Sequence, residues 1–119
     1  MSVVAEICVA LVAALHFYFL VLEMFLWEKP VAARIFGLTK EFATASRTLA
    51  GNQGLYNGFV GSGLLWSLWL GLEGRPFTYF LLVCVAIAGL YGTLTINRKP
   101  FYAQTLPAVA AMLLLSLSY

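Results

Sequence analysis

Two ionisable side chains, His16 and Glu23, interrupt the first apolar stretch of the sequence. They are seven residues apart, so in a helix they lie on nearly the same face. Ionisable groups within an apolar helix are costly and mark routes for protons, ions or ligands, and histidine changes its charge near neutral pH. The pair therefore predicts a site that binds or transports a small molecule. The alternative chemistry is acid–base catalysis by an intramembrane enzyme, such as an isomerase, on a lipophilic substrate.

Three amides, Asn52, Gln53 and Asn57, open a second apolar stretch. Gln53 and Asn57 are four residues apart and share a helix face. Polar groups in hydrocarbon need partners, so we expect these side chains to point into a helix bundle rather than toward lipid. All of the predicted ligand-binding residues except the deeper His16 share one depth near the cytoplasmic side. The predicted set is His16, Glu23, Gln53, Tyr56, Asn57, Tyr91 and Gln104.

A structural interpretation of the same polar residues stays open. Amides and a histidine also form hydrogen bonds between transmembrane helices. Glu23 can extend toward the membrane interface or pair with Arg98 or Lys99. The chain would then be a structural or accessory membrane subunit, and whether it is an enzyme is left open.

Residue content excludes several other kinds of site. One histidine and no aspartate make a closed zinc site improbable, and no metal is predicted. The motif for covalent haem is absent, and no cofactor is predicted. The segment GFVGSG lacks the lysine of a phosphate loop, and no basic patch with interleaved aromatics predicts a nucleic-acid partner. Cys8 and Cys84 lie in apolar stretches, so we expect buried free thiols rather than a disulfide.

The composition indicates an integral membrane protein. Hydrophobic residues make up 62% of the chain and charged residues 10%, whereas soluble domains have about 25% charged residues. Four segments approach the roughly 20 apolar residues that cross a hydrocarbon core of about 30 Å. They are residues 3–27, 51–72, 77–96 and 101–119. The prediction is an all-α bundle of four transmembrane helices, in which residues 1–119 form a single integral membrane domain.

The connection between the first two predicted spans has helix signals of its own. Pro30 can start a short helix that Gly37 ends, and Thr39 can cap the next helix. That next helix is expected to begin near Lys40 and to continue to Leu72, about 50 Å at 1.5 Å per residue, so its first turns would lie at the membrane surface. The connection is thus a short amphipathic segment on the cytoplasmic side.

Small residues and basic residues predict packing and orientation. Gly54, Gly58 and Ser62 recur every four residues and predict a ridge that lets a neighbouring helix approach closely, and Ala88 with Gly92 predicts a similar notch. Six of the seven lysines and arginines lie in the first and third connections, and only Arg75 lies in the second. The positive-inside rule therefore places the first and third connections in the cytoplasm and both termini outside. Pro107 predicts a local kink in the last span.

Five motifs, in order, give the sequence a resemblance to a known family. They are HFYFLVLEMFLW, FGLTKEFA, NQGLYNGF, AGLYG and Q-x-x-P. Together they resemble the bacterial domain-of-unknown-function family numbered 1304, over nearly the whole chain. The resemblance implies a small four-span membrane protein and implies no activity. The motif positions are His16, Glu23, Trp27, Asn52, Gln53, Tyr56, Asn57, Tyr91 and Gln104.

We therefore interpret the chain as a multi-pass protein of the bacterial cytoplasmic (inner) membrane with a polar pocket at the level of the inner leaflet. Small-molecule binding or transport through that pocket is the leading hypothesis. The intramembrane enzyme and the structural subunit are the alternatives. The expected partners are the lipid bilayer and, as open predictions, a small-molecule ligand and further copies of the chain in a homo-oligomer.

Overall fold

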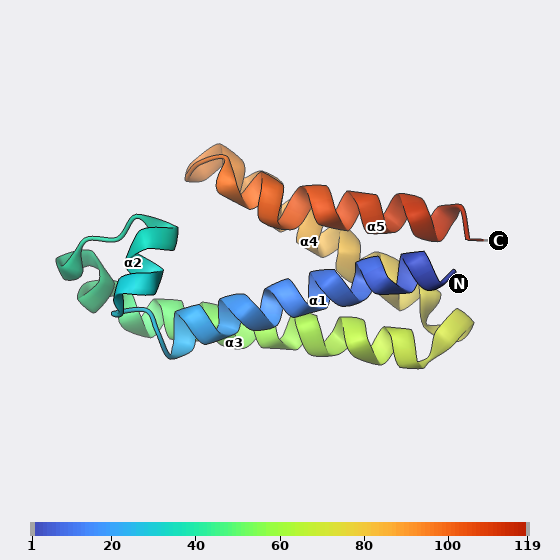
Figure 1. Cartoon of the computed structure of the whole chain (residues 1–119), viewed down its shortest axis with the longest axis horizontal. Coiled ribbons are helices and arrows are strands. Elements are labelled where there is room, and N and C mark those ends of the chain that lie inside the picture. The colour runs from blue at the N-terminus through green and yellow to red at the C-terminus, as the bar shows by residue number, and fades with distance from the viewer. Residues whose placement is uncertain (1, 119) are drawn as a thin grey trace. The chain divides into compact units, whose positions relative to one another are not determined.

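The structure, a computed structural model, describes residues 2–118, and these are almost entirely helical (Figure 1). No strand occurs among them. The elements in chain order are α1 (Val3–Met24), α2 (Pro30–Phe36), α3 (Lys40–Trp69), the 3-10 turn η1 (Gly71–Gly74), α4 (Arg75–Thr95), the π-helical turn η2 (Phe101–Thr105) and α5 (Leu106–Ser116). The all-α class is confirmed, while the predicted domain ends at residues 1 and 119 lie outside the described range.

Among the described residues 2–118, two helical segments are long and apolar enough to cross a membrane. They are α1, with 22 residues, and Gly71–Thr95, with 25 residues. The segment Phe101–Ser116 is apolar but shorter. Helix α3 is the longest helix, with 30 residues, but its amides, its glycines and its charged first turns lower its hydropathy. Membrane crossings at residues 51–72 and 101–119 therefore stay predictions.

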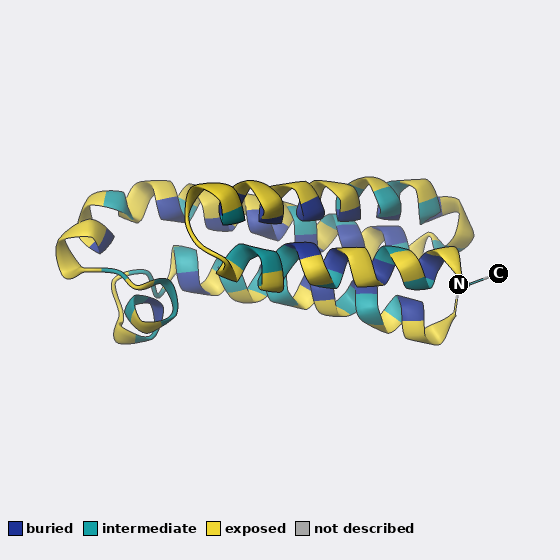
Figure 2. Ribbon diagram, turned by 90° about the horizontal axis from the view of Figure 1, so that it is seen from above, coloured by how far each residue is buried: buried dark blue, intermediate teal, exposed yellow. Residues whose placement is uncertain are grey.

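The described chain divides into two compact units. One is the continuous stretch 15–61, which contains the end of α1, all of α2 and the first part of α3. The other combines residues 2–14 with residues 62–118. Along each long helix, buried positions alternate with exposed ones, which is the pattern of helices packed on one side (Figure 2).

In the unit 15–61, α1 and α3 pack antiparallel through glycines. A Cβ atom added at Gly54 would lie 2.7 Å from Cγ of Met24, and one added at Gly58 would lie 2.6 Å from Cδ1 of Leu20. Both distances are shorter than a normal carbon–carbon contact of about 3.5–4.0 Å. The absence of side chains at these glycines therefore lets the two helices approach closely, as the sequence predicted for Gly54 and Gly58.

The third member of the glycine ridge differs from the prediction. Ser62 is exposed, and Gly61 packs on α1 instead, where an added Cβ would lie 2.8 Å from Cε2 of Phe17. An α-helix has 3.6 residues per turn, so steps of four and then three follow a straight face better than two steps of four. The ridge that contacts α1 is therefore formed by Gly54, Gly58 and Gly61.

The connection between α1 and α3 is built as the sequence predicted. Pro30 is the first residue of α2, and Gly37 ends that helix in the left-handed conformation, with φ of 68°. The hydroxyl of Thr39 accepts a hydrogen bond of 3.1 Å from the amide of Phe42. Since an N-cap side chain binds an amide two or three residues on, Thr39 caps α3 and fixes its start at Lys40.

In the other unit, α4 packs on η2 and α5 through two glycines one turn apart. A Cβ atom at Gly89 would collide with the side chain and backbone of Thr105, and one at Gly92 would lie 2.9 Å from Cβ of Pro100. The predicted notch of Ala88 with Gly92 is therefore wrong in its first member, because Ala88 is exposed and Gly89 is buried. The Thr105 hydroxyl also donates a hydrogen bond of 2.9 Å to the carbonyl of Ala86.

The last helix is irregular just before Pro107. The amide of Leu106 donates to the carbonyl of Phe101, five residues back, which is the π-helical pattern. Proline has no N–H for the carbonyl four residues before it and crowds that carbonyl. A widened turn N-terminal to Pro107 is therefore how the structure accommodates this proline.

The two cysteines are free thiols, as expected. Their predicted burial is only partly correct, because Cys8 is half-buried and Cys84 is exposed on the outer side of α4.

Candidate functional site

Glu23 and Asn57 meet between α1 and α3. The Asn57 Nδ2 amide donates a hydrogen bond of 2.5 Å to Oε1 of Glu23. Asn57 is 7% exposed, and Glu23 is half-buried. Gly54 lies one turn before Asn57, and a Cβ there would approach Cβ of Glu23 to 3.0 Å. The missing side chain at Gly54 thus allows the backbones to approach closely enough for this hydrogen bond.

The Glu23 carboxylate keeps acceptor capacity beyond this hydrogen bond. An ionised carboxylate offers about four lone-pair positions. Within residues 2–118, Glu23 accepts a hydrogen bond from the Asn57 amide and forms no ion pair, since the ion pair of this region joins Glu28 and Arg47. Glu23 is therefore able to accept a proton or a cationic group while it keeps its bond to Asn57.

His16 lies deeper along α1 than Glu23. Its side chain is 1% exposed, and its ring meets the edge of Phe19 at 6.2 Å between centroids. Seven residues of helix separate His16 from Glu23, which is about 10 Å at 1.5 Å per residue. The hypothesis that these two side chains act as acid and base on one substrate stays a prediction.

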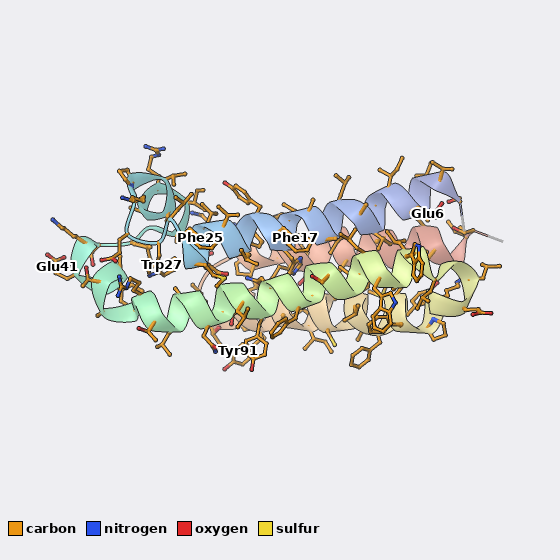
Figure 3. The ribbon with its side chains drawn as sticks, turned by 90° about the horizontal axis from the view of Figure 1, so that it is seen from below. Glu6, Phe17, Phe25, Trp27, Glu41 and Tyr91 are labelled. Carbon is orange, nitrogen blue, oxygen red and sulfur yellow. The ribbon has the colours of Figure 1, made fainter. Side chains whose placement is uncertain are left out.

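The remaining predicted site residues are less buried. In the unit 15–61, Gln53 is exposed, and Tyr56 is 56% exposed with its ring against Phe59 at 5.4 Å. In the other unit, Gln104 is half-buried in η2, and Tyr91 is 71% exposed, with its side chain directed away from the ribbon (Figure 3). The structure brings Glu23 and Asn57 together; convergence of the other residues on them stays a prediction.

A second polar cluster surrounds the turn after α1. The Trp27 indole N–H donates a hydrogen bond of 3.0 Å to the hydroxyl of Ser46. The Trp27 ring packs on Phe36 with 5.2 Å between the ring centroids. The Thr44 hydroxyl donates a hydrogen bond of 2.9 Å to the Glu28 carboxylate, and the Arg47 guanidinium forms an ion pair with the same carboxylate at 3.6 Å. These contacts tie the turn to the first turns of α3, where Figure 3 shows Trp27.

A pocket of about 260 Å³ lies beside this cluster. It opens between the turn after α1, the helix α2 and the start of α3. Its lining includes Trp27, Lys29, Pro30, Leu38, Thr39 and Lys40. Sequence reasoning interpreted Trp27 as an anchor at the membrane interface and as part of a motif, and it missed this pocket. Partners 16 to 19 residues apart in the sequence leave no periodic signal.

Comparison with known proteins settles the family. The family model described as "Protein of unknown function (DUF1304)" matches residues 10–116. The chain belongs to the DUF1304 family. It is also 33% identical over 115 residues to "Uncharacterized protein YpaA" of Lactococcus lactis subsp. lactis (strain IL1403), covering 95% of this chain and 97% of that protein. No solved structure matches the sequence.

The DUF1304 match includes both polar regions of this chain. Its range, residues 10–116, contains Glu23 and Asn57 as well as the pocket beside Trp27. Within residues 2–118 of this DUF1304 member, no group of three metal-ligand side chains is present. The Glu23–Asn57 pair and the pocket beside Trp27 are the two places considered below as binding sites.

Proposed function

We propose that this DUF1304 member is a four-span protein of the bacterial cytoplasmic membrane that binds a small organic cation, or moves it across the membrane, at a polar site centred on Glu23 and Asn57. One observation supports it most: buried Asn57 holds the half-buried Glu23 carboxylate at 2.5 Å inside a glycine-lined helix pair. A carboxylate in apolar surroundings favours a proton or a cationic occupant.

An organic cation is preferred to a metal ion in this proposal because no group of three metal-ligand side chains is present within residues 2–118. The unit that contains Glu23 also has the aromatic side chains Phe17, Tyr56 and Phe59, and aromatic faces attract cationic groups that have little water around them. The proposed site includes His16 and Gln53, which lie on the same two helices as Glu23 and Asn57. Tyr91 and Gln104 belong to the other unit and stay predicted members.

The membrane arrangement in the proposal has α1 and Gly71–Thr95 as two of the spans. Helices α3 and α5 supply the other two. Asn57 of α3 then faces α1, which offers Glu23 as its partner. The excess of lysine and arginine in the first and third connections supports both termini outside.

The test is binding of a defined lipophilic cation, tetraphenylphosphonium, to the purified protein in neutral detergent. Wild-type protein is expected to bind it, and Glu23→Gln is expected to weaken binding roughly tenfold or more, which is about 1.4 kcal/mol. Glu6→Gln is the matched control, because it removes the same charge near the other end of α1. Equal binding by wild type and Glu23→Gln, or no binding by wild type, would refute the proposal.

A structural role is the second candidate function, and the same hydrogen bond favours it. Glu23 and Asn57 satisfy each other between tightly packed helices, as interhelical polar pairs in membrane proteins do. In that case Glu23→Gln, which keeps a carbonyl acceptor for Asn57, would leave the fold unchanged and no cation would bind to any variant.

A further inference from the structure

Hydrogen bonds hold the segments that line the pocket beside Trp27 in place. The turn that forms one side is fixed to α3 by the Trp27–Ser46 hydrogen bond of 3.0 Å and the Thr44–Glu28 hydrogen bond of 2.9 Å. On the other side, Gly37 ends α2 with its amide bonded to the carbonyl of Ala33. A pocket held in shape before a ligand arrives costs less conformational entropy to fill.

The charges around this pocket are unequal. Glu28 is the lining carboxylate, and it is already occupied by the Thr44 hydroxyl and by Arg47 at 3.6 Å. Lys29 and Lys40 also line the pocket, and neither has an ion pair within residues 2–118. Two ammonium groups that form no ion pair among the described residues, and one carboxylate that already pairs with Arg47, therefore line the pocket.

Hydrogen-bond donors add to the positive charge. The Thr39 hydroxyl uses its oxygen to accept from the Phe42 amide, so its hydrogen stays available to a ligand. The pocket also lies at the N-terminus of α3, the positive end of the helix dipole, where anions are stabilised. Lys29, Lys40 and Thr39 together suit a tetrahedral anion with several acceptor oxygens.

We propose that this pocket binds a phosphate group, and that in the membrane this phosphate is the head group of an acidic phospholipid. The volume of about 260 Å³ corresponds to roughly nine water molecules at about 30 Å³ each, enough for a glycerophosphate group. Trp27, Pro30 and Leu38 give the pocket an apolar side next to the point where α1 ends. Acidic lipids concentrate near basic segments on the cytoplasmic side. This site is separate from the proposed cation site and does not depend on it.

The experiment measures thermal unfolding of the whole protein in neutral detergent with four additives. They are dihexanoyl phosphatidylglycerol, dihexanoyl phosphatidylcholine, glycerol 3-phosphate and inorganic phosphate. A ligand that binds only the folded state raises the unfolding midpoint, by an amount that grows with the logarithm of its concentration above the Kd. The phosphatidylglycerol is expected to raise it by several degrees, the phosphatidylcholine not at all, and the two soluble phosphates only at higher concentration.

Two double variants identify the site. The double variant Lys29→Gln with Lys40→Gln is expected to weaken phosphatidylglycerol binding roughly tenfold or more. Each basic residue near an acidic lipid surface contributes a share of the binding free energy, and the variant removes two of them. Arg34→Gln with Arg98→Gln removes the same charge from two exposed residues outside the pocket and is expected to leave binding unchanged. Lys29→Arg with Lys40→Arg keeps both charges and is expected to retain binding.

The outcomes separate the two sources of phosphate. Inorganic phosphate that binds as tightly as phosphatidylglycerol, with the same lysine dependence, supports the phosphate site and overturns the lipid assignment. If the two glutamine double variants lose phosphatidylglycerol binding equally, the pocket is not the binding site. The same conclusion follows if phosphatidylcholine binds as well as phosphatidylglycerol. Loss of phosphatidylglycerol binding in each single lysine variant supports the pocket even where the double variant does not fold.

Discussion

The hydrogen bond between Glu23 and Asn57 joins a half-buried carboxylate on α1 to a buried amide on α3. Asn57→Leu removes the donor and leaves the half-buried carboxylate without its amide. The expected loss is about 1–2 kcal/mol in the free energy of unfolding, because polar pairs in membrane proteins contribute modestly and an orphaned buried group adds a penalty.

The measurement is chemical or thermal unfolding in detergent. Asn52→Leu serves as the control, since the exposed amide of Asn52 lies on the same helix and is expected to change stability by less than about 0.5 kcal/mol. Similar losses from the two substitutions would mean that the hydrogen bond to Glu23 is not what stabilises this helix pair.

For single residues, the sequence predicted that Asn57 needs a hydrogen-bond partner, but it did not predict how far each polar side chain is buried. The i,i+4 spacing and the cost of amides in hydrocarbon identified Asn57 as a residue that needs a partner, and the structure gives it Glu23. The same reasoning put Gln53 on that face, but it is exposed, because it lies at the edge of the face that contacts α1. The Glu28–Thr44 contact was not predictable, since it depends on how a turn lies against a distant helix.

Helix α3 owes its packing to glycine positions rather than to apolar bulk. Gly58→Leu is expected to lower the free energy of unfolding by about 1–3 kcal/mol, because even a Cβ atom there would lie 2.6 Å from Leu20. Gly51→Leu is the matched change on the same helix, at a glycine with no atom within 4 Å of the position of an added Cβ. A loss at Gly51 as large as that at Gly58 would show that the cost does not come from contact with α1.

The π-helical turn η2 is expected to persist when Pro107, which follows it, is replaced. Pro107→Ala restores an N–H four residues after Ala103, so a regular α-helix becomes available through Phe101–Thr105. Because Thr105 is held against α4 by its bond to Ala86, we expect the turn to persist and the stability to change by less than about 1 kcal/mol. Amide exchange slowed through this turn in the variant would instead mean that proline alone causes the irregularity.

Elements were more predictable than their contacts, for physical reasons. Pro30, Gly37 and Thr39 act through local backbone geometry, and each has the role that its residue type predicted. The choice between Ser62 and Gly61, or between Ala88 and Gly89, depends on the rotation of one helix against another. A repeat of small residues shows that a close contact exists, but a shift of one residue turns the face by about 100° and the sequence does not determine it.

The distribution of charge over the whole molecule predicts its orientation in the membrane. A reporter that is active only in the cytoplasm, fused after the last residue, is expected to be inactive, because six of seven basic residues lie in the first and third connections. The same reporter inserted after Asn97, in the third connection, is the positive control. Activity at the C-terminus equal to that at Asn97 would reverse the assignment of that end.

The two compact units differ in how a growing chain can make them. Residues 15–61 are continuous, so every contact of that unit, from the glycine ridge to the Trp27–Ser46 bond, becomes available as soon as α3 leaves the ribosome. The other unit joins residues 2–14 to residues 62–118 and has to wait for the last helix. Its contacts also close a much longer loop, which makes them slower to form. During synthesis, the helix pair that contains Glu23 and Asn57 is therefore available to fold before the last helix has left the ribosome.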